Sequence, residues 1–402
     1  MKTKEELPIL NSSVMRGLIS MDRKAVGGYH RDSSVELLRI VAMLGIIAHH
    51  FVINSDVYQT ILDGNPTHPA SLYALVLGGW GKEGINVFLL ITGYYACKSV
   101  PKLRNYVKLV FEIAFYIIVG FLIFYLSGYY AYSLKEIVKT FIPFYYLGME
   151  FTTTYLVFWL FIPFINRLLV GLNHKSHFVL VVLLLLTDTM FQTLIRLPVA
   201  FTYMGWFFTA YIIAAYIRKC RDGDYKTKIR MFTELRCSAL FMISSFVLAI
   251  GSIIAAAFVY KRFGYNLIWY FVADCNKILS IAPATGLFLV FINSKIGYSK
   301  WINLVGGSVF GVLCIHANGN AMRQWLWGYV IKSVEQYEYG LSHPLLFVIQ
   351  SLVSIILIFT VCTAIDLFRR KFIEKPVMKK VDVMLVKHEW TDINNLYGLS
   401  DE

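Results

Sequence analysis

Charged residues are scarce in this sequence, and their scarcity excludes most classes of soluble protein. Asp, Glu, Lys and Arg make up 16% of the 402 residues, whereas a soluble domain usually carries about 25%. The chain therefore lacks the polar surface that a water-soluble fold or a disordered segment needs. Cysteine is also rare, and its six positions lie in apolar segments or basic loops, which argues against a disulfide scaffold. The HExxH, GxSxG, P-loop and dinucleotide-binding motifs are missing, and no metal site is expected.

Long apolar segments, by contrast, occupy most of the chain. Hydrophobic residues account for 57% of it, and stretches of about 18 apolar residues or more predict transmembrane helices. The segment 135–149 is too short and too charged to span a bilayer, so we expect it at the membrane interface. The sequence predicts an all-α polytopic membrane protein with about ten transmembrane helices, at 35–53, 75–97, 106–127, 151–170, 177–195, 199–217, 238–260, 267–293, 303–322 and 344–366.

The basic residues indicate how the chain is oriented. The net charge is +13, but Lys and Arg are spread over many short loops, which argues against nucleic-acid binding. They are about four times as frequent on the side that holds both termini, which predicts that both termini are cytoplasmic. We expect the first apolar run to be an uncleaved signal anchor. The chain then divides into a cytoplasmic segment 1–34, a membrane domain 35–366 and a basic cytoplasmic tail 367–402.

Ionisable residues inside the first predicted span are candidates for function, because charges within a bilayer are costly. Arg39 and His50 are eleven residues apart, so they lie on one stripe of a helix, about 16 Å from each other along its axis. His49 points about 80° away from this stripe. The alternative is that Arg39 reaches the headgroups and the two histidines only cap the outer end of the span.

The second and ninth spans carry further polar residues at a similar depth. Lys82 and Glu83 lie in the outer half of the second span, and His316 and His50 each lie about 20 Å from the cytoplasmic end of their spans. This match predicts a polar cavity near the outer face. The alternatives are an internal Lys82–Glu83 ion pair or interfacial collar, and a His316 that only satisfies hydrogen bonds in the core.

Several motifs, in this order, resemble those of the family-3 membrane acyltransferases, over about residues 31–375. They are the Arg39-x10-His50 pattern, Gly84-Ile-Asn-Val-Phe-Leu-Leu-Ile-Thr92-Gly-Tyr94, Trp159-Leu-Phe-Ile-Pro-Phe-Ile-Asn166, Ser308-Val-Phe-Gly-Val-Leu-Cys-Ile-His316 and Asp366-Leu-Phe-Arg369. The resemblance implies ten helices and an acyl-CoA donor that is loaded from the cytoplasm. It also implies transfer to a sugar hydroxyl or amine of a bacterial surface or exported glycan near the far face. The form of these motifs is similar to the polysaccharide O-acetyltransferase type without an appended esterase-like domain.

Two features depart from the pattern of that family. Thr92 stands where a serine is usual, which keeps the hydroxyl, and an R-x-x-R motif after the second span is missing. We therefore assign the phosphates of acetyl-CoA to the cations nearest that position, with the expectation that Arg39, Lys98, Lys102, Arg104 and Lys108 bind them.

The resemblance gives each candidate residue a role. His50 is expected to act as general base on the acceptor hydroxyl or to carry the acyl group, with Glu83 orienting it and His316 assisting. The other expected contacts to substrate come from Lys82, Asn86 and Thr92. Expected partners are the bilayer of the bacterial cytoplasmic membrane, acyl-CoA, and a glycan or lipid-linked sugar; a homodimer or a complex with polysaccharide-assembly proteins is left open. A polysaccharide flippase or polymerase without acyl transfer is the alternative function.

Overall fold

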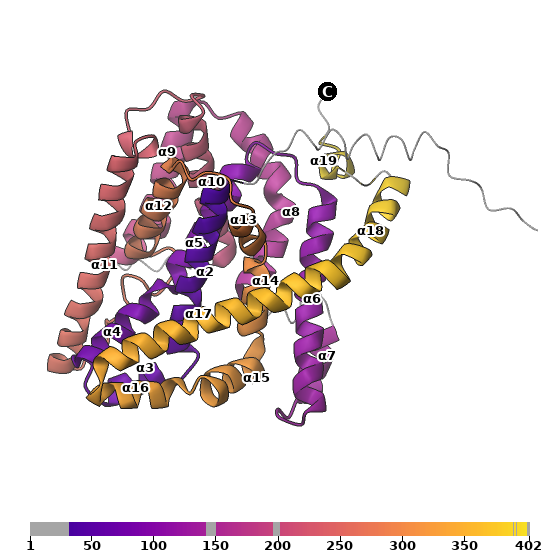
Figure 1. Ribbon diagram of the computed structural model, residues 1–402. Coiled ribbons are helices and arrows are strands. Elements are labelled where there is room, and N and C mark those ends of the chain that lie inside the picture. The colour runs from indigo at the N-terminus through magenta and orange to yellow at the C-terminus, as the bar shows by residue number, and fades with distance from the viewer. Residues whose placement is uncertain (1–31, 142–149, 196–201, 389, 391, 400–402) are drawn as a thin grey trace, which may run out of the picture.

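The computed structural model is built from helices, and it describes residues 32–141, 150–195, 202–388, 390 and 392–399 (Figure 1). This part of the chain contains no β-strand. The longer elements are α2 Ser33–Ile53, α5 Gly81–Ala96, α6 Leu103–Leu126, α8 Glu150–Val170, α9 His174–Leu184, η2 Leu185–Ile195, α10 Tyr203–Arg221, α11 Leu235–Phe263, α12 Ile278–Asn293, α17 Pro344–Arg369 and α18 Lys375–Lys387. The shorter ones are α3 Val57–Asp63, α4 Pro69–Leu77, η1 Gly78–Trp80, α7 Leu134–Phe141, η3 Arg230–Phe232, α13 Lys300–Gly306, α14 Val309–His316, α15 Gly319–Arg323, η4 Gln324–Val330, α16 Ser333–Ser342, η5 Arg370–Glu374 and α19 Ile393–Leu396.

Local sequence signals explain where the principal helices begin and end. α2 begins after Asp32, whose side chain accepts a hydrogen bond from the backbone N–H of Ser34 and so caps the helix. α11 ends at Gly264, which has a φ of +74° and closes the helix in the left-handed conformation that glycine tolerates. These caps confirm two of the predicted span boundaries to within a few residues.

Within the described residues, seven helices are long and apolar enough to cross a membrane, or eight if one bent pair counts as a single span. The bent pair joins Lys300–His316 to Gly319–Ser342 at an angle of 99°. The predicted span 303–322 is therefore wrong as one straight helix, because the chain turns after His316 and continues through Gly319 with a φ of +66°. The protein is a multi-pass membrane protein.

Two other predicted spans are helical but fall outside that set. The prediction at 199–217 corresponds to α10, and the prediction at 267–293 corresponds to the shorter α12, which begins only at Ile278 because turns occupy the residues before it. The predicted interfacial segment 135–149 begins as α7, and its remainder lies outside the described residues. The N-terminal segment 1–34 is likewise described only from residue 32 onward. The full count of about ten and the side of each terminus stay predictions.

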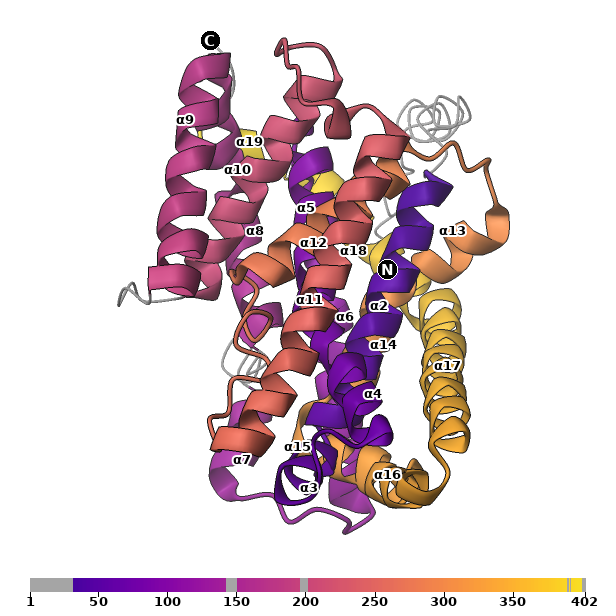
Figure 2. The same ribbon diagram turned by 90° about the vertical axis from the view of Figure 1, so that its left-hand side faces the viewer.

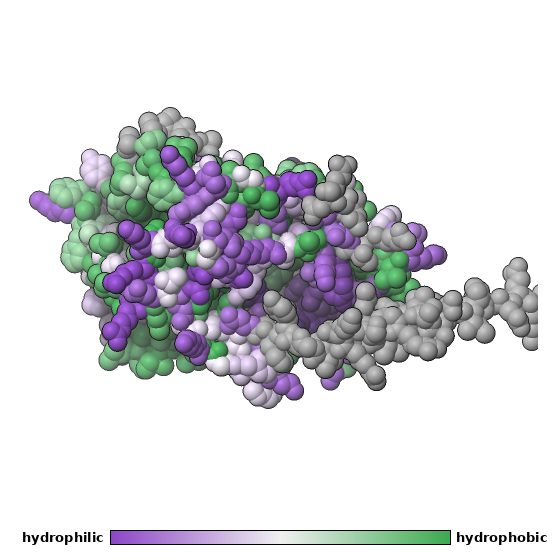
Figure 3. All heavy atoms as spheres, turned by 90° about the horizontal axis from the view of Figure 1, so that it is seen from above, coloured by the Kyte–Doolittle hydropathy of each residue, from purple (hydrophilic) through white to green (hydrophobic). Residues whose placement is uncertain are grey.

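α2 and α5 form the centre of the bundle and pack against each other (Figures 1 and 2). α10 and α12 pack on the other side of α5, and α11 runs along α12 at the periphery. α13, α14 and α17 also pack against α2. Seen from the end where α9, α12 and α13 lie, hydrophilic residues gather across the bundle and hydrophobic residues form much of its rim (Figure 3). The outward side chains of α11 and α17 are apolar, with Leu240 70% and Val353 58% exposed, which fits contact with lipid.

Candidate active site

The candidate site is built on α2, which approaches α5 very closely. A Cβ atom at Gly84 of α5 would lie 2.6 Å from Cγ1 of Ile46 and 2.8 Å from the carbonyl oxygen of Ala42. Since real Cβ atoms do not approach other atoms so closely, glycine at this position permits the contact. The glycine that opens the Gly84–Tyr94 motif thus places α5, and Lys82 with it, directly beside the helix that carries His50.

His50 forms a hydrogen-bonded pair with His316 of α14. Nδ1 of His50 lies 3.0 Å from Nε2 of His316, and Nδ1 of His316 lies 2.6 Å from the carbonyl oxygen of Val312. Because a carbonyl oxygen can only accept, Nδ1 of His316 carries a proton and its Nε2 accepts. His50 must then donate from Nδ1, which fixes its tautomer and leaves the lone pair on its Nε2. That nitrogen makes no hydrogen bond to any residue that the structure describes.

His50 lines a cavity of about 280 Å³, which we call the His50 cavity. Lys82 also lines it and donates from Nζ to the hydroxyl of Tyr203, 2.7 Å away. Arg323, at the end of α15, lines the same cavity. The remaining walls are mostly apolar and come from Ile46, Ile85, Phe88, Phe151 and Leu313, together with His49 and Gly81.

A second cavity, of about 190 Å³, adjoins the first along α2 and contains Arg39. We call it the Arg39 cavity. It shares the side chains of Phe88, Phe151 and Leu313 with the His50 cavity. The two cavities therefore meet at three apolar side chains and together follow the stripe of α2 from Arg39 to His50. A basic side chain stands at one end of this path and an imidazole with an available lone pair at the other.

A family model described as an acyltransferase domain matches residues 32–367. The chain belongs to the family-3 acyltransferases. It is accordingly a membrane acyltransferase, and the helices that carry Arg39, His50 and His316 all lie within the matched region. Neither the curated proteins nor the solved structures include a match to the chain.

His49 of the acyltransferase differs from its neighbour in its partner. Its Nδ1 lies 2.5 Å from the carbonyl oxygen of Gly78, so this nitrogen donates to the backbone. The side chain packs against Gly81, where a Cβ atom would collide with the imidazole ring. His49 lines the His50 cavity, but the structure also gives it a role in holding η1 and the start of α5 against α2.

The other residues predicted on α5 have different surroundings. Glu83 is buried, and its two carboxylate oxygens make no hydrogen bond within the described part of the chain, so it does not hydrogen-bond to His50. The amide of Asn86 is fully engaged, because it donates to the carbonyl of Cys275 and accepts from Trp206, each at 2.8 Å. It ties α5 to α10, which is a packing role rather than a contact with substrate. Thr92 lines the Arg39 cavity, and its hydroxyl lies 3.2 Å from that of Tyr155.

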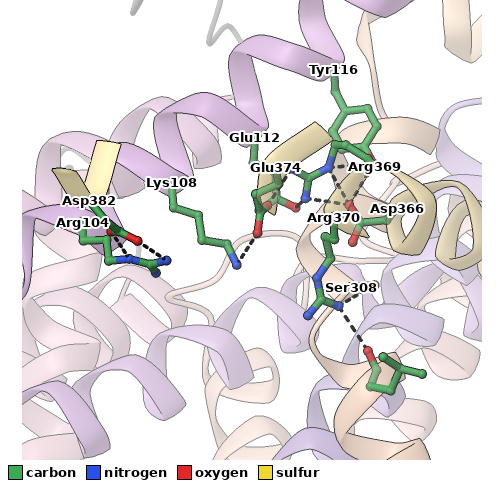
Figure 4. A network of polar contacts seen from close by, with 11 residues as sticks. Arg104, Lys108, Glu112, Tyr116, Ser308, Asp366, Arg369, Arg370, Glu374 and Asp382 are labelled. Atoms are coloured by element: carbon green, nitrogen blue, oxygen red, sulfur yellow. Dashed lines mark hydrogen bonds and ion pairs between the residues drawn. The ribbon is translucent and has the colours of Figure 1, made fainter. Parts of the chain in front are cut away.

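The predicted cluster of donor-binding cations is largely neutralised by the protein's own carboxylates. Arg104 donates to Asp382 of α18, with Nε 2.6 Å from Oδ1, and Nζ of Lys108 lies 2.8 Å from Glu374 (Figure 4). The backbone of Lys102 forms a bridge with Asp392 just before α6 begins. Among the cations predicted to bind the donor, the described part of the structure places Arg39 alone in either cavity.

Lys98 is held in the same way. Its Nζ lies 2.5 Å from Asp222 and 2.8 Å from Asp224, in the segment after α10. Burial alone would raise the pKa of Asp222, but the hydrogen bonds and charges of Lys98 and Arg218 lower it below the usual value of a carboxyl group. These partners lie on distant segments of the chain, so the sequence alone gave no sign of them.

A buried network around Arg369 holds α14 against α17 (Figure 4). Arg369 is 1% exposed and pairs with Glu112 and Asp366, each at 2.9 Å, and with Glu374 at 2.8 Å. Asp366 also accepts from the hydroxyl of Tyr116 at 2.8 Å. Asp366 packs directly on Gly311 of α14, where no Cβ atom fits, and Arg370 donates to the hydroxyl of Ser308 at 2.8 Å. The last predicted motif therefore fixes the helix that ends in His316.

Arg323 is a functional candidate that sequence reasoning missed. The predicted span ran to residue 322, which placed Arg323 in an external loop, whereas the bend after His316 turns it into the His50 cavity.

The described residues hold no group of three or more His, Cys, Asp and Glu side chains that could bind a metal ion.

Proposed function

We propose that the protein transfers an acyl group, with acetyl as the expected case, from acyl-CoA to a hydroxyl of a bacterial surface or exported polysaccharide or of its lipid-linked precursor. The observation that carries the proposal is the hydrogen-bonded chain from Val312 through His316 to His50. This chain leaves Nε2 of His50 as a base inside a cavity that also holds cationic donors.

The donor would enter from the Arg39 end. The phosphates of its nucleotide bind at this end, and Arg39 contributes because its Nε has no hydrogen-bond partner in the described residues. Nη1 of Arg39 also lies 3.3 Å from a carboxylate oxygen of Glu36, and this ion pair holds the guanidinium in place. The extended pantetheine arm passes the apolar side chains that the two cavities share and brings the thioester to His50.

The chemical step follows from the tautomer of His50. The acceptor hydroxyl gives its proton to Nε2 of His50 while its oxygen attacks the thioester carbonyl, and the C–S bond then breaks. The proton passes from His50 to the departing thiolate, which leaves as coenzyme A. His316 accepts the Nδ1 hydrogen of His50 throughout and thereby keeps the ring in position. In this arrangement the protein takes both substrates into one continuous space within the helical bundle.

The test is transfer of radiolabelled acetyl groups from acetyl-CoA to the host's polysaccharide by the purified protein in lipid nanodiscs. We expect His50→Ala to reduce transfer by about 10²–10⁴-fold, the usual contribution of a general base, while binding of acetyl-CoA is retained. His343→Ala is the matched control, because that histidine is exposed and lies outside both cavities. Transfer by His50→Ala at more than a tenth of the wild-type rate would refute the assignment.

A further inference from the structure

The His50 cavity has cations in its wall and no acidic side chain. Lys82 and Arg323 both line it, and its other polar contributors are two histidines and Tyr203. Two full positive charges in a partly enclosed space within a bilayer protein are costly unless an anion approaches them. Asp274 interacts electrostatically with Lys82 from outside the lining, so the charge of Arg323 is the one that has no counter-charge in the described part of the protein.

Arg323 is the clearer case of the two. It forms no hydrogen bond and no ion pair with any described residue, and its Nε is shielded from solvent without a partner. Glu83, the nearest acidic residue in the sequence to Lys82, does not pair with it either, because both carboxylate oxygens of Glu83 lack partners. The Arg323 side chain is half-buried, and its shielded Nε loses the hydrogen bond that it would make in water.

Lys82 supplies a second set of donors to the same space. One of its three hydrogens is donated to the hydroxyl of Tyr203 at 2.7 Å. The other two have no partner among the residues that the structure describes. A guanidinium and an ammonium that share a cavity are well suited to a carboxylate or a phosphate, which accepts several hydrogen bonds at once.

The acyl donor does not account for these charges. Its phosphates belong to the Arg39 end of the path, and the thioester that reaches His50 is neutral. The negative charge that develops on the carbonyl oxygen exists only during the reaction and does not balance the cations of the resting protein. We propose, on the basis of the proposed function, that the acceptor carries an anionic group, a carboxylate or a phosphate, which Arg323 and Lys82 bind so that a nearby hydroxyl faces His50.

Aromatic side chains complete such a site. Phe88, Phe151 and Tyr203 form part of the wall of the His50 cavity, and their faces can cover the apolar side of a sugar ring. An anionic sugar would thus be held by its charge at one end and by its ring in the middle. The carboxylate of an acidic sugar and the phosphate of a lipid-linked sugar share this chemistry.

The experiment measures sugar binding in the absence of acetyl-CoA. Full-length protein in nanodiscs is titrated with glucuronate, glucose 1-phosphate and neutral glucose, with saturation-transfer NMR as readout. We expect at least one anionic sugar to bind about tenfold more tightly than glucose, since charged hydrogen bonds stabilise more than neutral ones. A preference for glucuronate indicates an acidic sugar within the glycan, and a preference for glucose 1-phosphate indicates a lipid-linked precursor.

Substitutions connect the preference to the cavity. Arg323→Gln should reduce the ratio of anionic to neutral affinity to about twofold or less, and Arg323→Lys should restore most of it because the charge returns. Arg262→Gln removes the same charge at an exposed position outside the cavity and should leave the ratio as it is. Equal affinity for all three sugars in the wild-type protein, or an Arg323→Gln variant with the wild-type ratio, would overturn the proposal.

The two proposals fail separately. Anion-selective binding that depends on Arg323, together with transfer that does not need His50, would refute the proposed function alone. Transfer that depends on His50 but goes equally well to neutral and anionic glycans would refute the anionic acceptor alone. Arg323→Gln should also raise the KM for the acceptor more than it lowers kcat, because the variant loses a contact to the acceptor.

Discussion

Replacement of His316 tests whether it positions His50 or performs chemistry itself. His316→Phe keeps an aromatic ring in the buried site but removes the acceptor that lies 3.0 Å from Nδ1 of His50. His50 then loses the partner that holds its proton on Nδ1. A hydrogen bond of this kind contributes about 0.5–1.5 kcal/mol, so the active tautomer should become about 2- to 13-fold less populated. We expect kcat to fall by about tenfold, much less than in His50→Ala.

His316→Gln provides the matched variant, because the amide oxygen of Gln can accept a hydrogen bond where Nε2 of His316 does so now. We expect it to recover most of kcat. The KM for acetyl-CoA should stay the same in both variants, since Arg39 and its cavity are unchanged. Steady-state transfer rates, with the melting temperature as a check on folding, measure these effects. If His316→Phe is as inactive as His50→Ala and Gln does not restore activity, then His316 takes part directly and the positioning argument is wrong.

Three further predictions concern residues around the site. Glu83→Gln should reduce transfer by less than about tenfold, because the carboxylate does not hydrogen-bond to His50. A loss above about 100-fold would return Glu83 to the catalytic group. Arg39→Gln should raise the KM for acetyl-CoA about tenfold, whereas Arg104→Gln should change it less than about threefold, since Arg39 lines a cavity and Arg104 lies outside both cavities. Equal effects would contradict this distinction. Gly84→Ala should lower the free energy of unfolding by about 1–3 kcal/mol through overpacking against α2. Gly251→Ala, whose new Cβ meets open space, should leave the free energy of unfolding unchanged. Thermal denaturation of both variants measures the difference.

The sequence was sufficient for those parts of the site that depend on helical period and depth. The stripe of Arg39 and His50 follows from the rotation of one helix, and the depth of His316 follows from its rise. These local rules place the two imidazoles in one layer, and the structure has them 3.0 Å apart. The family resemblance was also correct, and the family model covers residues 32–367.

Features that depend on contacts between distant segments could not be predicted. Arg104 and Lys108 resemble free cations in the sequence, but their carboxylate partners lie about 270 residues later in the tail. Asn86 lies in a motif that suggests a contact with substrate. Its amide oxygen instead accepts from Trp206, and its amide nitrogen donates to the backbone of Cys275. The sequence predicts Arg323 in a loop because apolar residues continue past His316 and hide the bend that follows it. Hydropathy reports how apolar a segment is and does not report where it turns.

The position of Arg369 affects where the membrane domain can be cut. The family model ends at residue 367, and the last predicted span ends at 366, so a truncated protein designed from either boundary would lack Arg369 and Glu374. Glu112 and Asp366 would then remain buried without their cation, and removal of one partner of a buried ion pair costs about 3–5 kcal/mol. The minimal folded unit therefore extends at least through η5, and the first residues after the apolar span belong to the core of the enzyme.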